Sequence, residues 1–388
     1  MRFRNELDPG FSAAVRHAFR TYLERHQDHR FADARLVAKG TGLLLVWILA
    51  YAGILADPGP VYAFFLAILA GIAALLLAMN VGHDAAHECF TRWPSVDHAL
   101  QRVSFMLLGV DAYLWRFRHR NSHHHFPNVN GCDIDIDENP FLRLSPNQPR
   151  RPHFRWQHLY APVVYCMTVF DTVFVQDFMY LYKRRLANLQ DIHHPPAAHI
   201  SFYLSKMAFA MLVFVLPLLL TSLTWWQILI GYSGAAIVVS LLFIFLLIGT
   251  HFSDTATFPV VGPDGTLPGS WATHAVETSR NWATSSAIAN FLTGGANCHA
   301  AHHLFPKVSH RHYPVIAPMI RAAAHRFNTR YVESTFPAMI SSHFRFLSRM
   351  AKSPYKTPAP DPTLGADASV DHPDGMTRGR RVAERVSG

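Results

Sequence analysis

Long apolar runs alternate with polar, histidine-rich segments along this chain of 388 residues. A membrane-spanning helix needs about 20 mostly apolar residues. Four runs approach or reach this length, and we expect the spans at 41–56, 61–82, 202–223 and 228–249. They form two pairs, and each pair is joined by a short link at 57–60 or 224–226. The pattern therefore predicts two helical hairpins in a membrane.

Positive charge indicates which side of the membrane each segment occupies. The two short links carry no Lys or Arg, whereas basic residues flank the stretch 160–182 on both sides. Positively charged segments remain cytoplasmic, so we expect the N-terminus, the segment 83–201 and everything after 250 on the cytoplasmic side. The stretches 99–115 and 160–182 contain charged or amide side chains among apolar ones. We expect both to be helices that lie in the interface.

The predicted fold is an all-α integral membrane protein with four transmembrane helices in two hairpins, a cytoplasmic cap and interfacial helices. We expect a basic cytoplasmic segment at 1–40 and a membrane domain at 41–350. The tail at 351–388 is rich in Pro, Gly and Arg and poor in apolar side chains, so we expect it to be disordered. No apolar run stands near the start, and no cleaved signal peptide is expected.

The composition also favours a membrane protein. Charged residues make up 16% of the chain, against about 25% in soluble domains. The net charge of +9 suits loops that face anionic lipid, and no nucleic-acid motif accompanies it, so no nucleic-acid partner is expected. The four cysteines form no Cys-x-x-Cys pair, which excludes a disulfide scaffold and indicates a reducing environment. Histidine stands out, with 25 residues against 26 carboxylates.

Histidines gather in three short clusters near the predicted cytoplasmic boundary. These are HDAAH at 83–87, HRNSHHH at 119–125 and HAAHH at 299–303. A spacing of three or four residues puts two rings on one face of a helix. Adjacent histidines on a helix diverge by about 100° and can serve two metals. Because the clusters supply more imidazoles than one tetrahedral ion takes, we expect two metal ions held by neutral imidazole.

The clusters resemble the three histidine boxes of the integral-membrane fatty acid desaturases, over about residues 40–345. Within that family the chain is most similar to the linoleoyl-CoA desaturase-like bacterial branch. The matching stretches are HDAAH at 83–87, WRFRHRNSHHHFPN at 115–128, RLSP at 143–146, QHLYAP at 157–162 and HAAHHLFPKVSHRHYP at 299–314. The branch has Gln at the first position of its third box in many members, whereas this chain has His299. The resemblance therefore does not imply where a double bond would be placed.

The resemblance implies a bacterial inner-membrane enzyme that uses O₂ and two Fe ions, a non-haem di-iron centre, to introduce a double bond into an acyl chain. It implies nine imidazole ligands on the cytoplasmic side. Eight match directly: His83, His87, His119, His123, His124, His299, His302 and His303. The ninth should follow the fourth span, where His251 lies, and His274 is the alternative.

Further expectations concern the surroundings of the metals. We expect Asp84 and Asn297 to orient ligands through hydrogen bonds. Asp133, Asp135 and Asp137 form an exposed acidic run that we expect to be structural, with the alternative that they hold histidine rings or basic loops. His343 is expected to be a solvated or interfacial side chain. Candidates for an anionic substrate head group are Arg116, Arg118, Arg150 and Arg151.

The partners implied are an acyl substrate linked to CoA, to a carrier protein or to lipid, membrane lipid itself, and a separate electron donor. The donor would be a ferredoxin or a b-type cytochrome with its reductase, since no haem, flavin or iron–sulfur motif is present.

Other functions remain open at this point. A hydroxylase, or an acetylenase that forms a triple bond, would use the same histidine boxes. A metal transporter would place its site near the membrane midplane on broken helices, and a bis-histidine haem carrier would use single histidines within the bundle. Histidine doublets at the boundary favour the desaturase.

Overall fold

The computed structural model describes residues 1–4, 8 and 10–352. These residues are mostly helical, as expected, and their strands form two short parallel pairs. Four helical segments are long and apolar enough to cross a membrane: Ala34–Leu55, Pro60–Ala86, Pro196–Leu220 and Trp225–Thr250. The expected tail lies outside the described residues from 353 onward, and residues 351–352 belong to the last helix.

The spanning segments are built from nine elements. The first is α2 (Ala34–Leu55), and the second combines α3 (Pro60–Leu77), the π-helical turn η2 (Ala78–Gly82) and α4 (His83–Ala86). The third combines α11 (Pro196–Ala210), η6 (Met211–Val215) and α12 (Leu216–Leu220), and the fourth combines α13 (Trp225–Leu247) and η7 (Ile248–Thr250).

The first span begins at Ala34, so the boundary expected at residue 40 falls inside α2. The Asp33 side chain accepts a hydrogen bond from the Leu36 amide at 2.9 Å and caps the helix. This N-cap starts the helix in polar sequence, ahead of the apolar run. The third span also starts ahead of its apolar run, and Pro196 in its first turn favours the start of a helix there.

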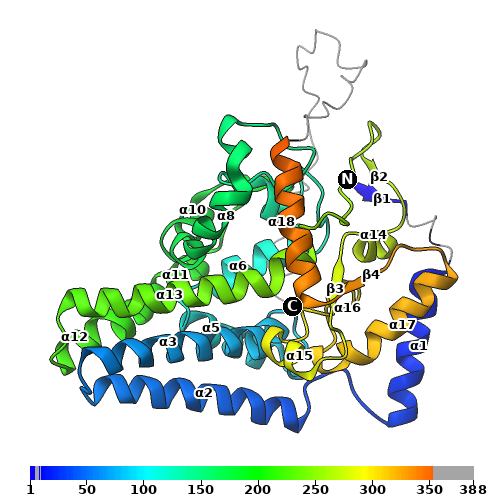
Figure 1. Ribbon diagram of the computed structural model, residues 1–388. Helices are drawn as coiled ribbons and strands as arrows, with labels where there is room; N and C mark the ends of the chain where they lie inside the picture. Colours follow the sequence, from blue (N-terminus) through cyan, green and yellow to red (C-terminus); the bar gives the residue numbers. More distant parts are fainter. Residues whose placement is uncertain (5–7, 9, 353–388) are drawn as a thin grey trace. The chain divides into compact units, whose positions relative to one another are not determined.

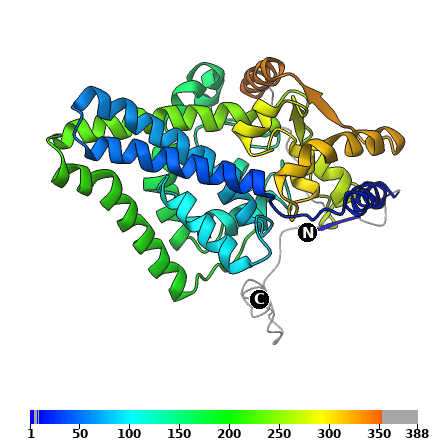
Figure 2. The ribbon, with the colours of Figure 1, turned by 90° about the horizontal axis from the view of Figure 1, so that it is seen from below.

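Small residues bring the spans together. Figure 2 shows α2 and α3, in blue, running side by side. A side-chain carbon at Gly71 of α3 would lie only 3.1 Å from Val239 of α13, so glycine allows the two helices to approach closely. Leu49 and Leu219 point outward and are 70% and 71% exposed. Such exposed apolar side chains on the outer surface of the bundle suit contact with lipid.

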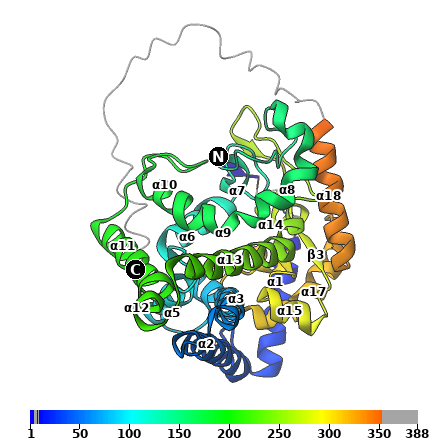
Figure 3. The ribbon, with the colours of Figure 1, turned by 60° about the vertical axis from the view of Figure 1, so that its left-hand side comes forward.

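The expected interfacial stretches are broken helices. Residues 99–115 cover parts of α5 (Pro94–Met106) and α6 (Ala112–Arg118), which are separated by Gly109 at φ 76°. Residues 160–182 cover parts of two helical segments, Pro152–Cys166 and Thr168–Tyr182, that meet at 65°. These comprise η4 (Pro152–Trp156), α8 (Gln157–Cys166), α9 (Thr168–Asp171), η5 (Thr172–Gln176) and α10 (Asp177–Tyr182). Of these elements, α8 and α9 pack on α13, on the side opposite α3 (Figure 3).

The remaining elements form a cap at one end of the spans (Figure 1). Its helices are α1 (Phe11–His26), η3 (His119–His123), α7 (Ile134–Asp137), α14 (Trp271–Glu277), α15 (Ala287–Thr293), α16 (His299–Leu304), η8 (His310–His312), α17 (Tyr313–Arg326) and α18 (Phe336–Lys352). Strand β1 (Arg2–Phe3) pairs with β2 (Thr266–Leu267), and β3 (Arg280–Trp282) pairs with β4 (Val332–Ser334). Buried apolar side chains of α1 and α17, including Phe11, Phe19 and Ile320, join these helices to α16.

Gly294 ends α15 in the left-handed conformation, with φ 56°. A side-chain carbon there would lie 2.1 Å from the carbonyl oxygen of Met79, in the π-helical turn that precedes His83. We predict that Gly294→Ala destabilises the protein by about 2 kcal/mol or more, from backbone strain and this clash. Thermal unfolding in detergent measures the effect.

Gly42→Ala is the matched control, since a side-chain carbon at Gly42 meets no atom within 4 Å. It should change stability by less than about 1 kcal/mol. Equal effects of the two substitutions would contradict the close contact between Gly294 and Met79.

Candidate metal centre

Four parts of the chain bring histidines to one place, at the junction of spans and cap. The first cluster lies on α4 and the residue after it, directly after the turn η2. The second lies in the π-helical turn η3 and the two residues after it, and the third lies on α16. His251 follows η7 at the end of the fourth span. Single π-turns are frequent at functional sites, because they rotate side chains away from the regular helical spacing.

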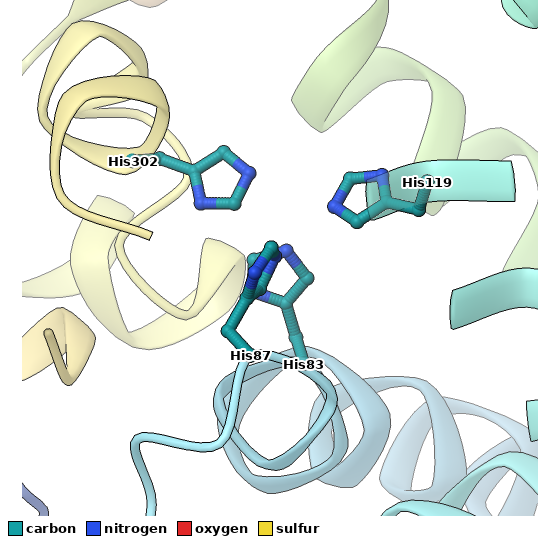
Figure 4. Close-up of side chains that lie close together, drawn as sticks. All are labelled: His83, His87, His119 and His302. Carbon is teal, nitrogen blue, oxygen red and sulfur yellow. The ribbon is translucent and has the colours of Figure 1, made fainter. Parts of the chain in front are cut away.

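The histidines form two groups with one ring between them. In the first group, the ligand atoms of His83, His87, His119 and His302 all lie within 4.8 Å of one another, and their rings face a common point (Figure 4). The second group, formed in the same way, contains His123, His251, His299 and His303. The ring of His124 lies 4.4 Å from that of His302 and 4.5 Å from that of His303, between centroids.

The spacing of ring nitrogens within the second group fits an ion. The Nε2 atom of His251 is 3.0 Å from that of His303 and 2.6 Å from that of His299. The Nε2 atoms of His299 and His303 are 3.2 Å apart. Nitrogens bound at 2.0–2.1 Å around a tetrahedral ion are about 3.4 Å apart. Three converging Nε2 atoms cannot all satisfy one another by hydrogen bonding, whereas all three can bind one cation.

The two candidates for the ninth position lie in different surroundings. His251 belongs to the second group, and its Nδ1 donates a hydrogen bond to the carbonyl oxygen of Thr278 at 3.0 Å. His274 is also buried, but it packs against Phe3 with 5.1 Å between ring centroids and belongs to neither group. The geometry therefore favours His251.

Hydrogen bonds on the far side of two rings direct their Nε2 atoms into the second group. The Nδ1 of His123 lies 3.2 Å from Asp133 and 3.3 Å from Asp135, and the Nδ1 of His299 donates to the carbonyl oxygen of Ala296 at 3.0 Å. Such partners fix the tautomer and the orientation of a metal-binding imidazole. The contact of Asp133 with His123 matches the alternative given for the acidic run, in which its carboxylates hold histidine rings.

Two nearby carboxylates give His123 a different protonation state from the other rings. Burial alone would lower the pKa of His123, but Asp133 and Asp135 outweigh it and raise the pKa to about 9. Burial lowers the pKa of His299 to about 3, and it places the pKa values of His302 and His303 well below their ordinary range. These rings are therefore neutral at pH 7, which is the form that binds metals.

Asp84 and Asn297 contact other partners than the expected ones. Asp84 accepts from the backbone amide of His310 at 3.1 Å and lies 3.0 Å from its Nδ1. Asn297 accepts from the Thr293 hydroxyl at 2.8 Å and donates to the Trp282 carbonyl at 3.1 Å. Among the described residues, neither side chain has a hydrogen bond to a histidine ring of the two groups or to the ring between them. Both side chains therefore connect elements around the histidines: Asp84 joins α4 to η8, and Asn297 joins the segment before α16 to β3.

A cavity of about 280 Å³ adjoins the histidines. Six of the nine line it: His83, His119, His123, His251, His299 and His302. Its other walls include apolar side chains of α13, such as Phe243 and Leu247. We call this space the metal cavity.

The four arginines proposed for a head group are dispersed. Arg118 lines the metal cavity and Arg151 lines a neighbouring one. Arg116 donates to the Gln101 side chain at 3.1 Å, and Arg150 lies on an exposed loop. The structure therefore does not gather them into one site.

His343 is fully buried, contrary to expectation. Its Nε2 accepts from the Tyr165 hydroxyl at 2.6 Å, and its Nδ1 donates to the Phe252 carbonyl at 2.7 Å. These bonds connect α18 and α8 to the residue next to His251. Burial lowers the pKa of His343 to about 4, so the ring is neutral. No sequence motif marks His343, because its partners lie far away in the chain.

Comparison with known proteins places the chain in a family. The family model described as "Fatty acid desaturase" matches residues 60–335. The chain belongs to this family and is an oxidoreductase, a fatty acid desaturase, as its histidine boxes predict.

Individual relatives agree with this assignment. The chain is 29% identical, over 347 residues, to the sn-1 linoleoyl-lipid 6-desaturase of Synechocystis sp., covering 86% of this chain and 96% of that protein. It is 27% identical over 358 residues to the protein of the same name from Arthrospira platensis, covering 89% and 94%. It is 28% identical over 298 residues to the acyl-lipid (8-3)-desaturase of Physcomitrium patens, covering 76% of this chain and 62% of that protein. The expected similarity to a linoleoyl desaturase-like branch is confirmed.

We predict that His343→Ala lowers the free energy of unfolding by about 2–4 kcal/mol, since it leaves two buried polar partners unpaired and opens a cavity. Denaturation of the metal-free protein measures this. His325→Ala, on the exposed side of α17, should stay within about 0.5 kcal/mol of the wild type.

The pH dependence of the unfolding free energy tests the protonation state of His343. Unfolding returns the pKa of His343 from about 4 to its ordinary value of 6.5, so the unfolded chain binds the extra proton. The stabilisation from the neutral ring is complete above pH 6.5 and is lost as the pH falls to about 4. The slope of unfolding free energy against pH in this range should be smaller in His343→Ala. An unchanged slope would contradict a buried, neutral His343.

Proposed function

We propose that this desaturase is an O₂-dependent enzyme that holds two Fe ions through nine histidines and introduces a double bond into a lipid-linked acyl chain. The supporting observation is the pair of buried histidine groups, with His124 between them, beside a cavity with apolar walls. All-imidazole sets suit iron and other transition metals. Two ions bound there would supply the activation of O₂ that cleavage of an unactivated C–H bond requires.

Each group has a proposed role in holding the ions. His83, His87, His119 and His302 would hold one ion, and His123, His251, His299 and His303 would hold the other. His124 would complete the set from between them. His274 is then a buried packing residue. Asp133 would orient the ring of His123 through its Nδ1, at 3.2 Å, and the ring would release the proton on its Nε2 when an ion binds there.

The metal cavity would position the substrate. Phe243, Ile244 and Leu247 form an apolar wall along α13, with histidines of both groups opposite. An acyl chain in this space would present adjacent methylenes to the ions, and burial would exclude water. Arg118, at the edge of the same cavity, would remain near the polar end of the substrate.

The electron balance requires a partner. Removal of two hydrogens from adjacent methylenes, with reduction of O₂ to two waters, consumes two further electrons and two protons. A separate donor, such as a ferredoxin or a b-type cytochrome with its reductase, would supply the electrons. We place the histidines and the cap on the cytoplasmic side of a bacterial inner membrane, where such donors occur and where the basic segments of the chain belong.

Lipid linkage of the substrate is proposed over CoA or carrier-protein linkage. The cyanobacterial relatives are named for linoleoyl-lipid, and the Physcomitrium patens relative for acyl-lipid. Lateral entry from the bilayer suits a cavity that adjoins the spanning helix α13.

The direct test is His302→Ala in the full-length protein. Loss of a ligand should remove at least one iron per chain and lower product formation by more than about 100-fold, the upper range for partners outside the ligand set. Elemental analysis and mass spectrometry of the lipid product measure both. His17→Ala, on the exposed side of α1, is the control and should retain iron and activity.

Full iron content and full activity in His302→Ala would refute the ligand assignment. The product mass also decides between outcomes that share this site. A desaturase product lacks two hydrogens, an acetylenase product lacks four, and a hydroxylase product gains one oxygen.

A further inference from the structure

A second, more polar cavity adjoins the metal cavity. It has a volume of about 510 Å³ and lies between the loop after α7 and the helical segments α9 to α10. The two cavities share three wall residues: Glu138, Asn139 and Gln176. The two cavities are therefore neighbours that border the same three side chains. We call this second space the head-group cavity.

The charges around the head-group cavity do not suit a polyanion. Its lining contains three carboxylates, from Asp137, Glu138 and Asp171, and two cations, from Arg151 and Lys183. Lys183 already pairs with Glu138 at 2.5 Å. Like charges facing a ligand exclude it as effectively as attractive contacts select one. The several phosphates of CoA would meet an excess of carboxylates here.

Two buried acceptors in this lining have no hydrogen-bond partner among the described residues. They are Oδ1 of Asn130 and Oδ2 of Asp137. The other oxygen of Asp137 accepts from the Gly131 amide at 3.0 Å, so the side chain is held with Oδ2 free. Burial raises the pKa of Asp137 to about 6, which reflects poor solvation of this carboxylate. Buried acceptors require donors, and the described residues supply none to these two oxygens.

Exposed apolar side chains form part of the rim of the cavity. Phe141 and Val175 belong to the lining and are 51% and 54% exposed. Met179 lines the same side. Exposed apolar side chains around a polar cavity fit a molecule that arrives from a bilayer with its polar end leading into the cap. The occupant is therefore a lipid rather than a soluble metabolite.

We propose that this cavity binds the head group of the lipid whose acyl chain enters the metal cavity, and that it selects head groups that carry hydrogen-bond donors. Hydroxyl groups and a primary ammonium both have this chemistry and would satisfy Asn130 and Asp137. A choline head group has no donor. The proposal rests on the proposed function, because it takes the metal cavity as the acyl site.

Asp137→Asn tests the proposal with a change of one functional group. The asparagine Oδ1 can still accept from Gly131, while an NH₂ group replaces the unpaired oxygen. The probes are phosphatidylethanolamine, a monoglycosyl diacylglycerol, phosphatidylcholine and acyl-CoA, all with the same acyl chains. Their dissociation constants are measured on the full-length, iron-loaded protein in detergent by native mass spectrometry.

We expect the wild type to bind at least one donor-bearing lipid about tenfold or more tightly than phosphatidylcholine, which corresponds to one good hydrogen bond to a charged group. Asp137→Asn should abolish this preference. Glu24→Gln, on the exposed side of α1, should retain it. Asn130→Ala is the second variant, because it removes the other acceptor and leaves the bond between Asp137 and Gly131 intact; it should weaken the preference.

The two donor-bearing lipids distinguish ammonium from hydroxyl recognition. Equal binding of all lipids by the wild type, tighter binding of acyl-CoA, or an unchanged preference in both variants would overturn the proposal. Iron content and product are measured on the same samples. If the protein holds two irons and desaturates lipid but binds all head groups equally, the head-group site alone is refuted. If it prefers donor-bearing head groups but holds no iron and forms no product, the proposed function is refuted instead.

Discussion

The convergence of neutral imidazoles is the interaction on which the rest of this structure depends. In the second group, ring nitrogens from two distant parts of the chain, His251 and the pair on α16, face one another at distances of 2.6–3.2 Å. Without a cation, these lone pairs compete for too few protons in a buried place. A bound cation would take them as ligands, and its binding free energy would then contribute to folding. Such an ion would add to the apolar contacts that already join the spans to the cap, such as those of Leu246 with Trp282 and Met339.

The spanning helices and histidine boxes were predictable because both are local patterns. Apolar runs and spacings of three or four residues are visible in the chain itself. The start of α2 was not, because the Asp33 cap extends the helix into polar sequence. The choice between His251 and His274 also required coordinates, since both follow the fourth span and only distance separates them. His343 was misjudged because its burial depends on α8 and α18 meeting in space.

One acidic run faces two different places. Asp133 and Asp135 lie beside His123, while the next two carboxylates, Asp137 and Glu138, line the head-group cavity. The short helix α7 contains Asp135 and Asp137, and Asp133 and Glu138 flank its two ends. A shift of α7 would therefore change both the orientation of His123 and the shape of the head-group cavity. The sequence shows the run, but the division of its roles follows only from the fold.

Helix α18 lies beyond the residues that the family model matches, yet it holds the segment that carries His251. His343 binds the Phe252 carbonyl, and Arg345 binds Asp254 at 2.6 Å. A nascent chain on the ribosome therefore lacks this support until nearly all of it has been synthesised. Any ion held by the second group would therefore gain its full support only after translation, and a message truncated shortly before residue 336 would yield a chain that has the spans but lacks the helix that holds the segment around His251.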